Sequence, residues 1–236
     1  TDVRRFINQA AHMNRQSSNF THTVRYEYGN RKGTIATNVG TGTTWAVPLE
    51  FMNDIPAATS ASGRIYVDTY SGATLVGTKY TGFTVTVPAS VRPTVTATLD
   101  DITGMDGIYG SPVKGLSKIK ITPSVTLAYS SPIASYTITA NGVTYNTSPA
   151  TTGLLTASGS SVVTVTVRDK RGRTGSWSYT MSVKDYSSPA ISKLTVHRCD
   201  ADGSENDQGA YCKATFSVAV SQMAVNAGGS TVSLKV

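Results

Sequence analysis

The sequence contains few charged residues, few cysteines and few histidines. Charged residues make up 15% of the 236 positions, whereas globular domains average about 25%. The chain holds 2 cysteines and 3 histidines, too few cysteines for a disulfide scaffold. No stretch approaches the ~18 consecutive apolar residues that a membrane-crossing helix requires. We therefore expect no membrane span, and coiled-coil and collagen-like chains are excluded as well.

Threonine and serine supply the polar surface instead. The chain has 35 Thr and 27 Ser, residues that favour half-exposed strands and disfavour helix interiors. Alternation of apolar and polar residues recurs, as in Phe20–Tyr28 and Arg64–Tyr70, and this period is typical of strands. Asn141-Gly142 is the preferred pair for a type I′ hairpin turn. The pattern predicts an all-β fold, with helix only in short pieces such as 3–10 or 49–53.

Two proline junctions divide the chain. Pro93 and Pro189 are 96 residues apart, close to the ~100 residues of an immunoglobulin-like sandwich. We expect tandem immunoglobulin-like or fibronectin-like β-sandwich domains in a rod-like arrangement. Residues 1–92 would form the first sandwich, 93–188 the second, and 189–236 the first part of a third, incomplete module.

The third module is too short to bury its own apolar residues. Strands are expected at 191–198, 214–220 and 231–236, each with apolar residues at alternate positions. A small isolated sheet is marginal in water. We expect cover from residues after Val236, from the second domain or from another chain.

The positive charge is spread along the chain. The net charge is +7, with 9 basic and 5 acidic residues in 1–92, 8 and 5 in 93–188, and 4 and 4 in 189–236. Nucleic-acid binders concentrate basic residues on one face. The distribution indicates general solubility and predicts no nucleic-acid partner.

Recognisable catalytic motifs are missing from the sequence. His12, His22 and His197 lie near no serine nucleophile elbow and no HExxH spacing. Asp100, Asp101 and Asp106 lie in one glycine-bearing loop and are expected to be solvated turn residues, although a fold can still bring two carboxylates together. We expect no enzyme, no catalytic residue and no cofactor.

One basic cluster is a candidate binding site. The sequence VRDKRGRTG reads as a hairpin tip and carries Arg168, Lys170, Arg171 and Arg173. Four cations at an exposed turn can contact phosphate groups of a polyanion. The alternative is a solvated tip that protects the hairpin from edge pairing.

Two cysteines bracket a polar loop in the third module. Cys199 and Cys212 lie at the ends of consecutive expected strands, and a disulfide forms if the strands bring them within reach. Reduced thiols are the alternative. The run from Asp200 to Asp207 partly matches a calcium loop, but it lacks the glycine and glutamate of an EF-hand. A weak cation site and a simple polar turn both remain open there.

Aromatic residues are the remaining candidates for recognition. Tyr66 and Tyr70 share one face of an expected strand, where they form either a sugar platform or ordinary sheet packing. Trp45 and Trp177 are expected to pack in cores.

Several loop phrases together resemble a known family. These phrases are SNFTHTV within NRQSSNFTHTVRYEYGNRKGTIATNVG, DKRGRTG before SWSYTMSVKDYSSP, and RCDADG followed by GAY. From about Asn14 onward the chain resembles minor structural tail proteins of long-tailed, siphovirus-type phages and prophages of Gram-positive bacteria. The segment before Asn14 departs from that pattern.

The resemblance implies a place in a virion rather than a reaction. It implies a non-enzymatic component of a phage tail, baseplate or tail fibre that contributes to host attachment. Its partners would be other tail proteins, further copies in a symmetric assembly, and host-envelope glycans. A bacterial cell-surface adhesin and a carbohydrate-binding accessory region of a cell-wall hydrolase are the alternatives, because sandwiches host many functions.

Overall fold

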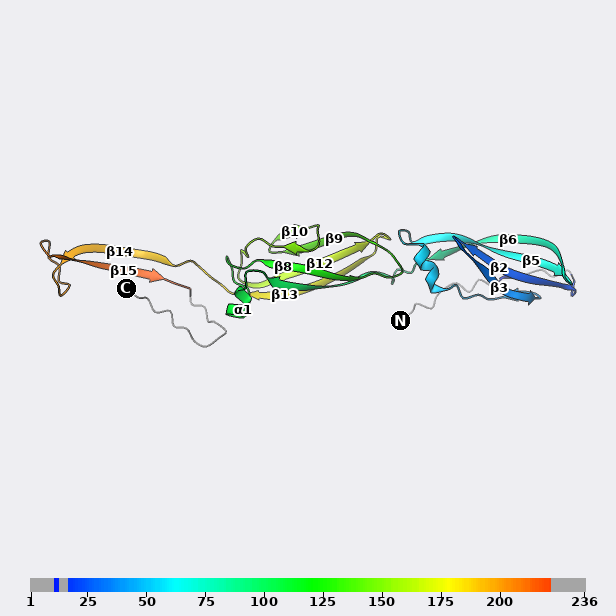
Figure 1. The fold of residues 1–236 in the computed structure, drawn as a ribbon, viewed down its shortest axis with the longest axis horizontal. Helices are drawn as coiled ribbons and strands as arrows, with labels where there is room; N and C mark the ends of the chain where they lie inside the picture. The colour runs from blue at the N-terminus through cyan, green and yellow to red at the C-terminus, as the bar shows by residue number, and fades with distance from the viewer. Residues whose placement is uncertain (1–10, 13–16, 222–236) are drawn as a thin grey trace. The chain divides into compact units, whose positions relative to one another are not determined.

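A computed structural model describes residues 11–12 and 17–221. The predicted all-β fold is confirmed, because strands dominate these residues and the helices are short (Figure 1). One is the 3-10 helix η1 (Leu49–Asp54) and the other is α1 (Met105–Tyr109). The expected helix at 3–10 and the expected strand at 231–236 lie outside the described residues.

The chain divides into two compact units. Unit 1 comprises Thr1–Thr96, Ser124–Tyr136 and Thr166–Ser176. Unit 2 comprises Ala97–Pro123, Thr137–Val165 and Trp177–Val236. The sequence predicted a domain boundary at Pro93, but unit 1 also includes two later segments, Ser124–Tyr136 and Thr166–Ser176.

The main sheet of unit 1 is antiparallel and has the strand order β3-β2-β5-β6. Its strands are β2 (Phe20–Tyr28), β3 (Arg31–Val39), β5 (Ser60–Ser71) and β6 (Thr74–Thr86). The short strands β1 (Ala11–His12) and β4 (Gly42–Thr43) pair with each other. Because side chains alternate along each strand, the sheet has an inner and an outer face.

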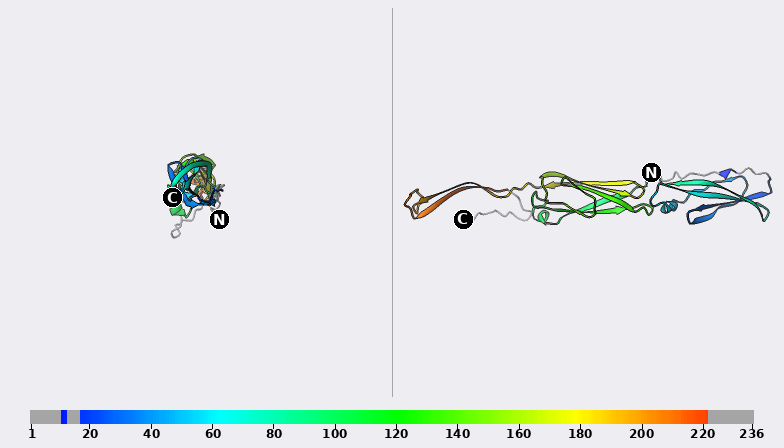
Figure 2. Two further views of the ribbon diagram at one scale, coloured as in Figure 1. Left: turned by 90° about the vertical axis from the view of Figure 1, so that its right-hand side faces the viewer. Right: turned by 90° about the horizontal axis from the view of Figure 1, so that it is seen from above.

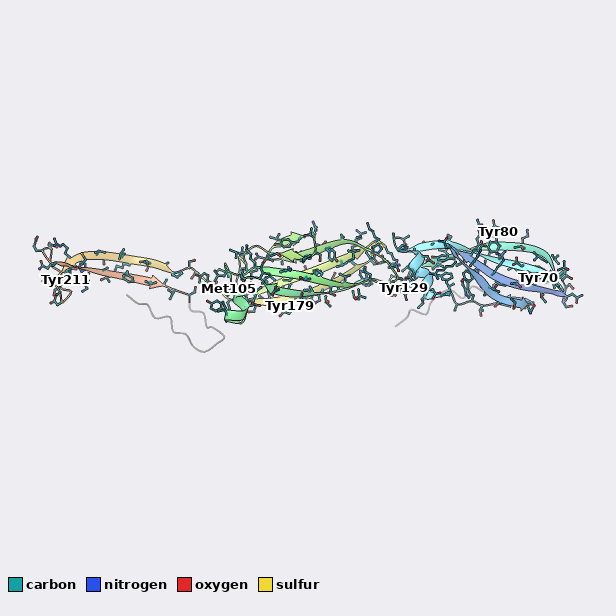
Figure 3. All side chains as sticks on the ribbon, viewed as in Figure 1. Tyr70, Tyr80, Met105, Tyr129, Tyr179 and Tyr211 are labelled. Carbon is teal, nitrogen blue, oxygen red and sulfur yellow. The ribbon has the colours of Figure 1, made fainter. Side chains whose placement is uncertain are left out.

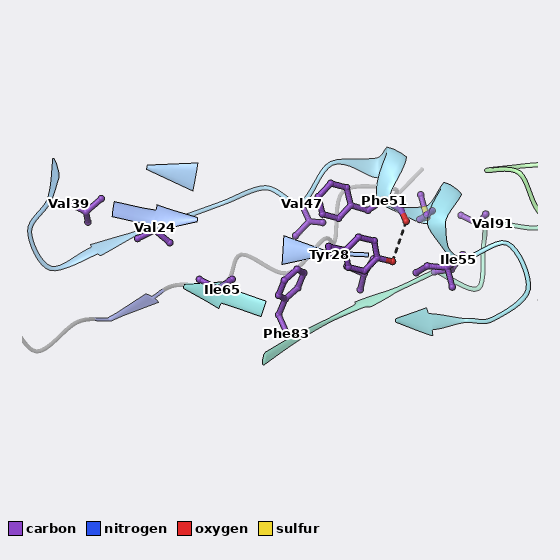
Figure 4. Close-up of a cluster of buried hydrophobic side chains, with 12 residues drawn as sticks. Val24, Tyr28, Val39, Val47, Phe51, Ile55, Ile65, Phe83 and Val91 are labelled. Atoms are coloured by element: carbon purple, nitrogen blue, oxygen red, sulfur yellow. Dashed lines mark hydrogen bonds between the residues drawn. The ribbon is translucent and has the colours of Figure 1, made fainter. Parts of the chain in front are cut away.

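The inner face is covered by helix η1 and its flanking loops. Phe51 and Met52 of η1 are 1% and 0% exposed, and Tyr28 stacks on Phe51 with ring centroids 4.8 Å apart. The buried Tyr28 hydroxyl donates a hydrogen bond to the Phe51 carbonyl, as Figure 4 shows. Trp45 packs against this cluster, as predicted. Burial of several aromatic rings is the main stabilising contribution to this core.

Strands β7 to β13 form two further sheets. One has the order β11-β8-β7 and the other β10-β9-β12-β13. Their strands are β7 (Thr94–Asp101), β8 (Ile119–Thr126), β9 (Ile133–Ala140), β10 (Val143–Tyr145), β11 (Ala150–Thr151), β12 (Gly159–Asp169) and β13 (Thr174–Val183).

Apolar residues from both of these sheets are buried between them, as in a β-sandwich. Ile119 and Ile121 of β8 and Ile138, Val163 and Val165 of the other sheet are at most 1% exposed. The predicted hairpin turn between β9 and β10 is confirmed, because Val143 pairs with Ala140 and the two turn residues have φ of 51° and 74°.

The last two strands pair only with each other among the described residues. They are β14 (Ala190–Cys199) and β15 (Tyr211–Ala219), an antiparallel ribbon seen in Figure 1 and in the right-hand view of Figure 2. One face of the ribbon is apolar, with Leu194 opposite Phe216 and Ile191 opposite Val218. These side chains are 39% to 66% exposed. The other face carries mainly polar side chains such as Lys193, Thr195 and Lys213.

Candidate functional site

The outer face of sheet β3-β2-β5-β6 gathers charged and aromatic side chains. Register places Arg25 of β2 opposite Tyr66 of β5, and Tyr66 opposite Tyr80 of β6. Alternation then puts the neighbouring odd positions of β2 and even positions of β5 on the same face. We call this surface the outer face; it is made by Arg25, Glu27, Lys32, Thr34, Arg64, Tyr66, Asp68, Thr78 and Tyr80.

Two arginines contact two neighbouring tyrosine rings on the outer face. The Arg25 guanidinium carbon lies 4.1 Å from the centroid of the Tyr66 ring, and that of Arg64 lies 4.9 Å from the centroid of the Tyr80 ring. The two tyrosine rings are 5.6 Å apart at an angle of 45°. Tyr80 projects from β6 and is 62% exposed (Figure 3). Such cation–π contacts hold rings in place while leaving part of their surface free.

Two carboxylates of the outer face hold these side chains in place through hydrogen bonds. Arg25 donates through Nε to Asp68 at 2.8 Å, and the Thr78 hydroxyl donates to the same carboxylate at 2.7 Å. The hydrogen bond from Arg25 is the main reason why the pKa of Asp68 lies below its usual value. The Tyr66 hydroxyl donates to Glu27 Oε2 at 2.7 Å. The outer face is therefore preorganised.

A shallow cleft opens beside this network. Its volume is about 190 Å³, and it is lined by Arg25, Tyr26, Glu27, Lys32, Gly33 and Thr34. Lys32 and Thr34 are exposed on β3 and lie opposite Glu27 and Arg25 of β2. The cleft thus combines hydrogen-bond donors and acceptors beside exposed aromatic rings, a combination suited to binding a polar ligand.

The sequence located this surface only in part. The sequence singled out Tyr66 with Tyr70, but the ring that packs beside Tyr66, at a tilt, is Tyr80 of the neighbouring strand. Tyr70 lies beyond a register shift and pairs with Leu75. The signal that could have identified this polar face is the alternation of charged residues in RYE and RIYVD, but the contacts across the face depend on strand register.

The predicted basic tip is not solvated as a whole, which corrects one of the two interpretations of that cluster. Arg171 is 6% exposed. Its guanidinium donates to the carbonyls of Ile55 at 2.7 Å, Met52 at 3.0 Å, Ala128 at 2.8 Å and Tyr129 at 2.5 Å. A helix end leaves carbonyls unpaired, and Arg171 satisfies those at the end of η1 within unit 1.

Burial of Arg171 changes what the basic cluster offers to a ligand. Burial lowers the pKa of Arg171, partly offset by Asp169. Arg173 also turns to the protein and donates to the Val87 carbonyl at 3.0 Å. Arg168 and Lys170 are exposed. Contact with a polyanion stays a prediction and now depends on Arg168 and Lys170.

The two cysteines are not brought together. Cys199 lies opposite Tyr211, whereas Cys212 lies opposite Arg198, so their side chains point to opposite faces of the ribbon. Both are free, with Cys199 buried and Cys212 exposed. The disulfide that the sequence allowed is therefore not formed, because the strand register is offset by one residue.

The polar turn between β14 and β15 uses its oxygens internally. Asp202 accepts hydrogen bonds from Ser204, and Asp200 accepts one from Asn206 at 2.9 Å. Across the described part of the chain, no group of three or more His, Cys, Asp or Glu side chains is arranged to hold a metal ion.

The candidate catalytic residues are dispersed. His22 is buried on the inner face beside the Thr69 hydroxyl, and His197 pairs with Glu205 at 3.3 Å. The side chain of His12 lies outside the described residues. Asp101 is not a solvated turn residue, which corrects the expectation; it is 6% exposed and accepts a hydrogen bond from Ser117 at 2.6 Å.

Comparison with known proteins gives one family. A family described as "Siphovirus protein of unknown function" matches residues 7–226. Among solved structures, fibronectin(III)-like modules of Clostridium thermocellum CbhA are similar at 15% identity, covering 72% of this chain and 82% of that chain with a TM-score of 0.33. No curated protein matched, and no helix within the described residues is long and apolar enough to cross a membrane. Since the family match spans nearly the whole sequence, the chain belongs to this siphovirus protein family.

Proposed function

We propose that the chain is a non-enzymatic structural component of a siphovirus tail, baseplate or tail fibre, and that it contributes to host attachment. The family match over residues 7–226 carries this proposal. It favours a virion over a bacterial adhesin or a hydrolase accessory region. In such an assembly the partners are other tail proteins and further copies of this chain.

The strand-rich architecture of the two units supports a structural role. The described residues are mainly strands, and several of their carboxylates are engaged in hydrogen bonds within the fold. Asp68 and Asp101 illustrate this, since each accepts hydrogen bonds from neighbouring side chains. Preorganised groups of this kind support binding surfaces as well as stability.

We assign the modules as residues 1–92, 93–188 and 189–236. Repetition of modules suits a tail, because many copies of a weak binding surface in a symmetric particle give strong attachment through avidity. The outer face of β3-β2-β5-β6 is the surface we assign to host contact.

Purified particles test the proposal. Mass spectrometry of gradient-purified virions, with immunogold labelling against this chain, should find the chain at the tail. Purified chain should also slow adsorption of the phage to host cells. Absence of the chain from intact virions that still infect would contradict the structural role.

A further inference from the structure

We propose that the outer face of β3-β2-β5-β6 binds a neutral oligosaccharide, an inference that rests on the proposed host-contact function and names its ligand class. The ligand would lie across the strands, from the cleft at Lys32 and Glu27 to the ring of Tyr80. The argument depends on the cleft, on the exposed ring and on the balance of charge between them.

The cleft presents donors and acceptors side by side. Lys32 and the guanidinium of Arg25 donate, whereas Glu27 accepts and Thr34 does both. Glu27 keeps acceptor capacity, because its side chain is 45% exposed and only Oε2 receives the Tyr66 hydroxyl. Sugar hydroxyls donate and accept at the same time. Adjacent hydroxyls of one sugar can therefore bind a cation and a carboxylate that lie next to each other.

The exposed ring lies at the other side of the outer face. Tyr80 is 62% exposed, and Arg64 contacts its ring. An aromatic ring offers an apolar surface to the C–H groups of a sugar, with a polar hydroxyl at its edge. From β3 to β6 the sheet crosses three strand spacings, about 14 Å. That span fits a short oligosaccharide, whereas the cleft of about 190 Å³ fits one of its units.

The charge balance favours a neutral ligand over a polyanion. Arg25 is already paired with Asp68 at 2.8 Å and lies 3.6 Å from Glu27. A phosphate in the cleft would lie beside Lys32 but also beside the exposed Glu27 carboxylate, whose like charge would repel it. A neutral hydroxyl group meets no such repulsion.

Titration of the purified chain tests the site. NMR titration with cellotriose, maltotriose and the trimer of N-acetylglucosamine should show at least one ligand binding at about millimolar Kd. The affected amides should lie in β2, β3, β5 and β6. Polyglycerol phosphate and inorganic phosphate serve as anionic probes and should bind at least tenfold more weakly.

Matched substitutions locate the site. Tyr80→Ala and Glu27→Gln should each weaken saccharide binding about tenfold, while Tyr211→Ala, at a tyrosine that is 57% exposed on β15, should not. A cooperative thermal unfolding transition, measured for each variant, confirms that the variant is folded. Glu27→Gln keeps the size of the side chain, so it separates lost charge from lost packing.

Several results would overturn the proposal. Absence of binding by all three trisaccharides at about 10 mM would do so, as would tighter binding of the phosphate polymer. Loss of binding on Tyr179→Ala, with Tyr80→Ala unchanged, would place the site at the stacked Trp177–Tyr179 pair instead. If no trisaccharide binds but the chain is found in virions, the oligosaccharide proposal fails and the structural role stands. If a trisaccharide binds but the chain is absent from virions, only the structural role is contradicted.

Discussion

The sheet β3-β2-β5-β6 and the ribbon β14–β15 are built from the same alternating pattern, yet their exposed faces differ in kind. In the sheet, helix η1 covers the apolar face, and the face left exposed carries paired charges and tyrosines. In the ribbon, the apolar face itself is exposed, with Leu194 at 61% and Val196 at 59%. Alternation determines which residues share a face, but not which face is covered.

The difference has a physical cause in the connecting segments. Between β3 and β5 the chain supplies Val47, Phe51 and Met52, which are buried against the sheet. Between β14 and β15 it supplies only a polar turn rich in Asp and Gly. A two-stranded ribbon without such cover buries too little apolar area to be stable by itself.

Removing the cover of the sheet should produce the largest effect. Phe51→Ala deletes a ring that is 1% exposed and stacks on Tyr28, and we expect a loss of about 3–5 kcal/mol in unfolding free energy. Urea denaturation followed by tyrosine and tryptophan fluorescence measures this loss. Leu75→Ala, at a side chain that is 52% exposed, is the control and should change stability by less than about 0.5 kcal/mol. Equal effects would show that η1 is not the cover.

Removing Arg171 should have the next largest effect. Arg171→Met keeps most of the packing volume but leaves the carbonyls of Met52, Ile55, Ala128 and Tyr129 without their donor. We expect a loss of about 3 kcal/mol, measured by the same denaturation. Arg168→Met, at an exposed cation of the same tip, should be nearly neutral. A neutral Arg171→Met would mean that water replaces the guanidinium without cost.

The ionised Asp101 carboxylate should make the stability of the fold fall at low pH. Burial tends to raise its pKa, but hydrogen bonds from Ser117 and Thr103 outweigh burial and lower it. The stabilisation is therefore present above the unfolded pKa of about 3.9 and is lost as pH falls through the lower folded value. Thermal melts from pH 6 to pH 2 should show a smaller acid-dependent loss in Asp101→Asn than in the unchanged chain. Parallel curves would contradict this assignment.

Polar substitution of the exposed apolar face should have the smallest effect on stability. Leu194→Ser and Phe216→Ser alter side chains that are 61% and 39% exposed, so we expect less than about 0.5 kcal/mol in the dilute single chain. The same variants should associate less at high concentration, because an exposed apolar patch promotes association. Sedimentation velocity measures association. A large loss of stability in the dilute chain would show that the face is already covered.

Local features were predictable from the sequence, and distant pairings were not. The strand at Phe20–Tyr28 follows from the alternation of apolar and polar residues. The turn at Asn141-Gly142 follows from the preference of type I′ hairpin turns for this pair of residues. The buried position of Arg171 could not be predicted, because the carbonyls of Met52 and Ile55 that accept its hydrogen bonds lie more than a hundred positions away in the sequence. A sequence shows that an arginine lies at a turn, but not that a helix end requires a donor there.

The candidate site shows the same limit. Alternation predicted that Tyr66 lies on one face of its strand, but contact with Arg25 and Tyr80 required the register of two strand pairings. The cysteines failed as a pair for the same reason, since an offset of one residue sends them to opposite faces. Strand register is set by the covered face and by turns, and both are tertiary properties.

Hydrogen exchange on the dilute single chain tests most directly whether the ribbon lacks the cover that the sandwich has. Amides at 214–219 in β15 should exchange about a hundredfold faster or more than those at 162–167 in β12, because the ribbon opens without exposing a buried core. Val163 and Val165 in β12 are fully buried, whereas Phe216 and Val218 in β15 are 39% exposed. Equal protection of the two segments would contradict the account and show that the ribbon is covered within the single chain.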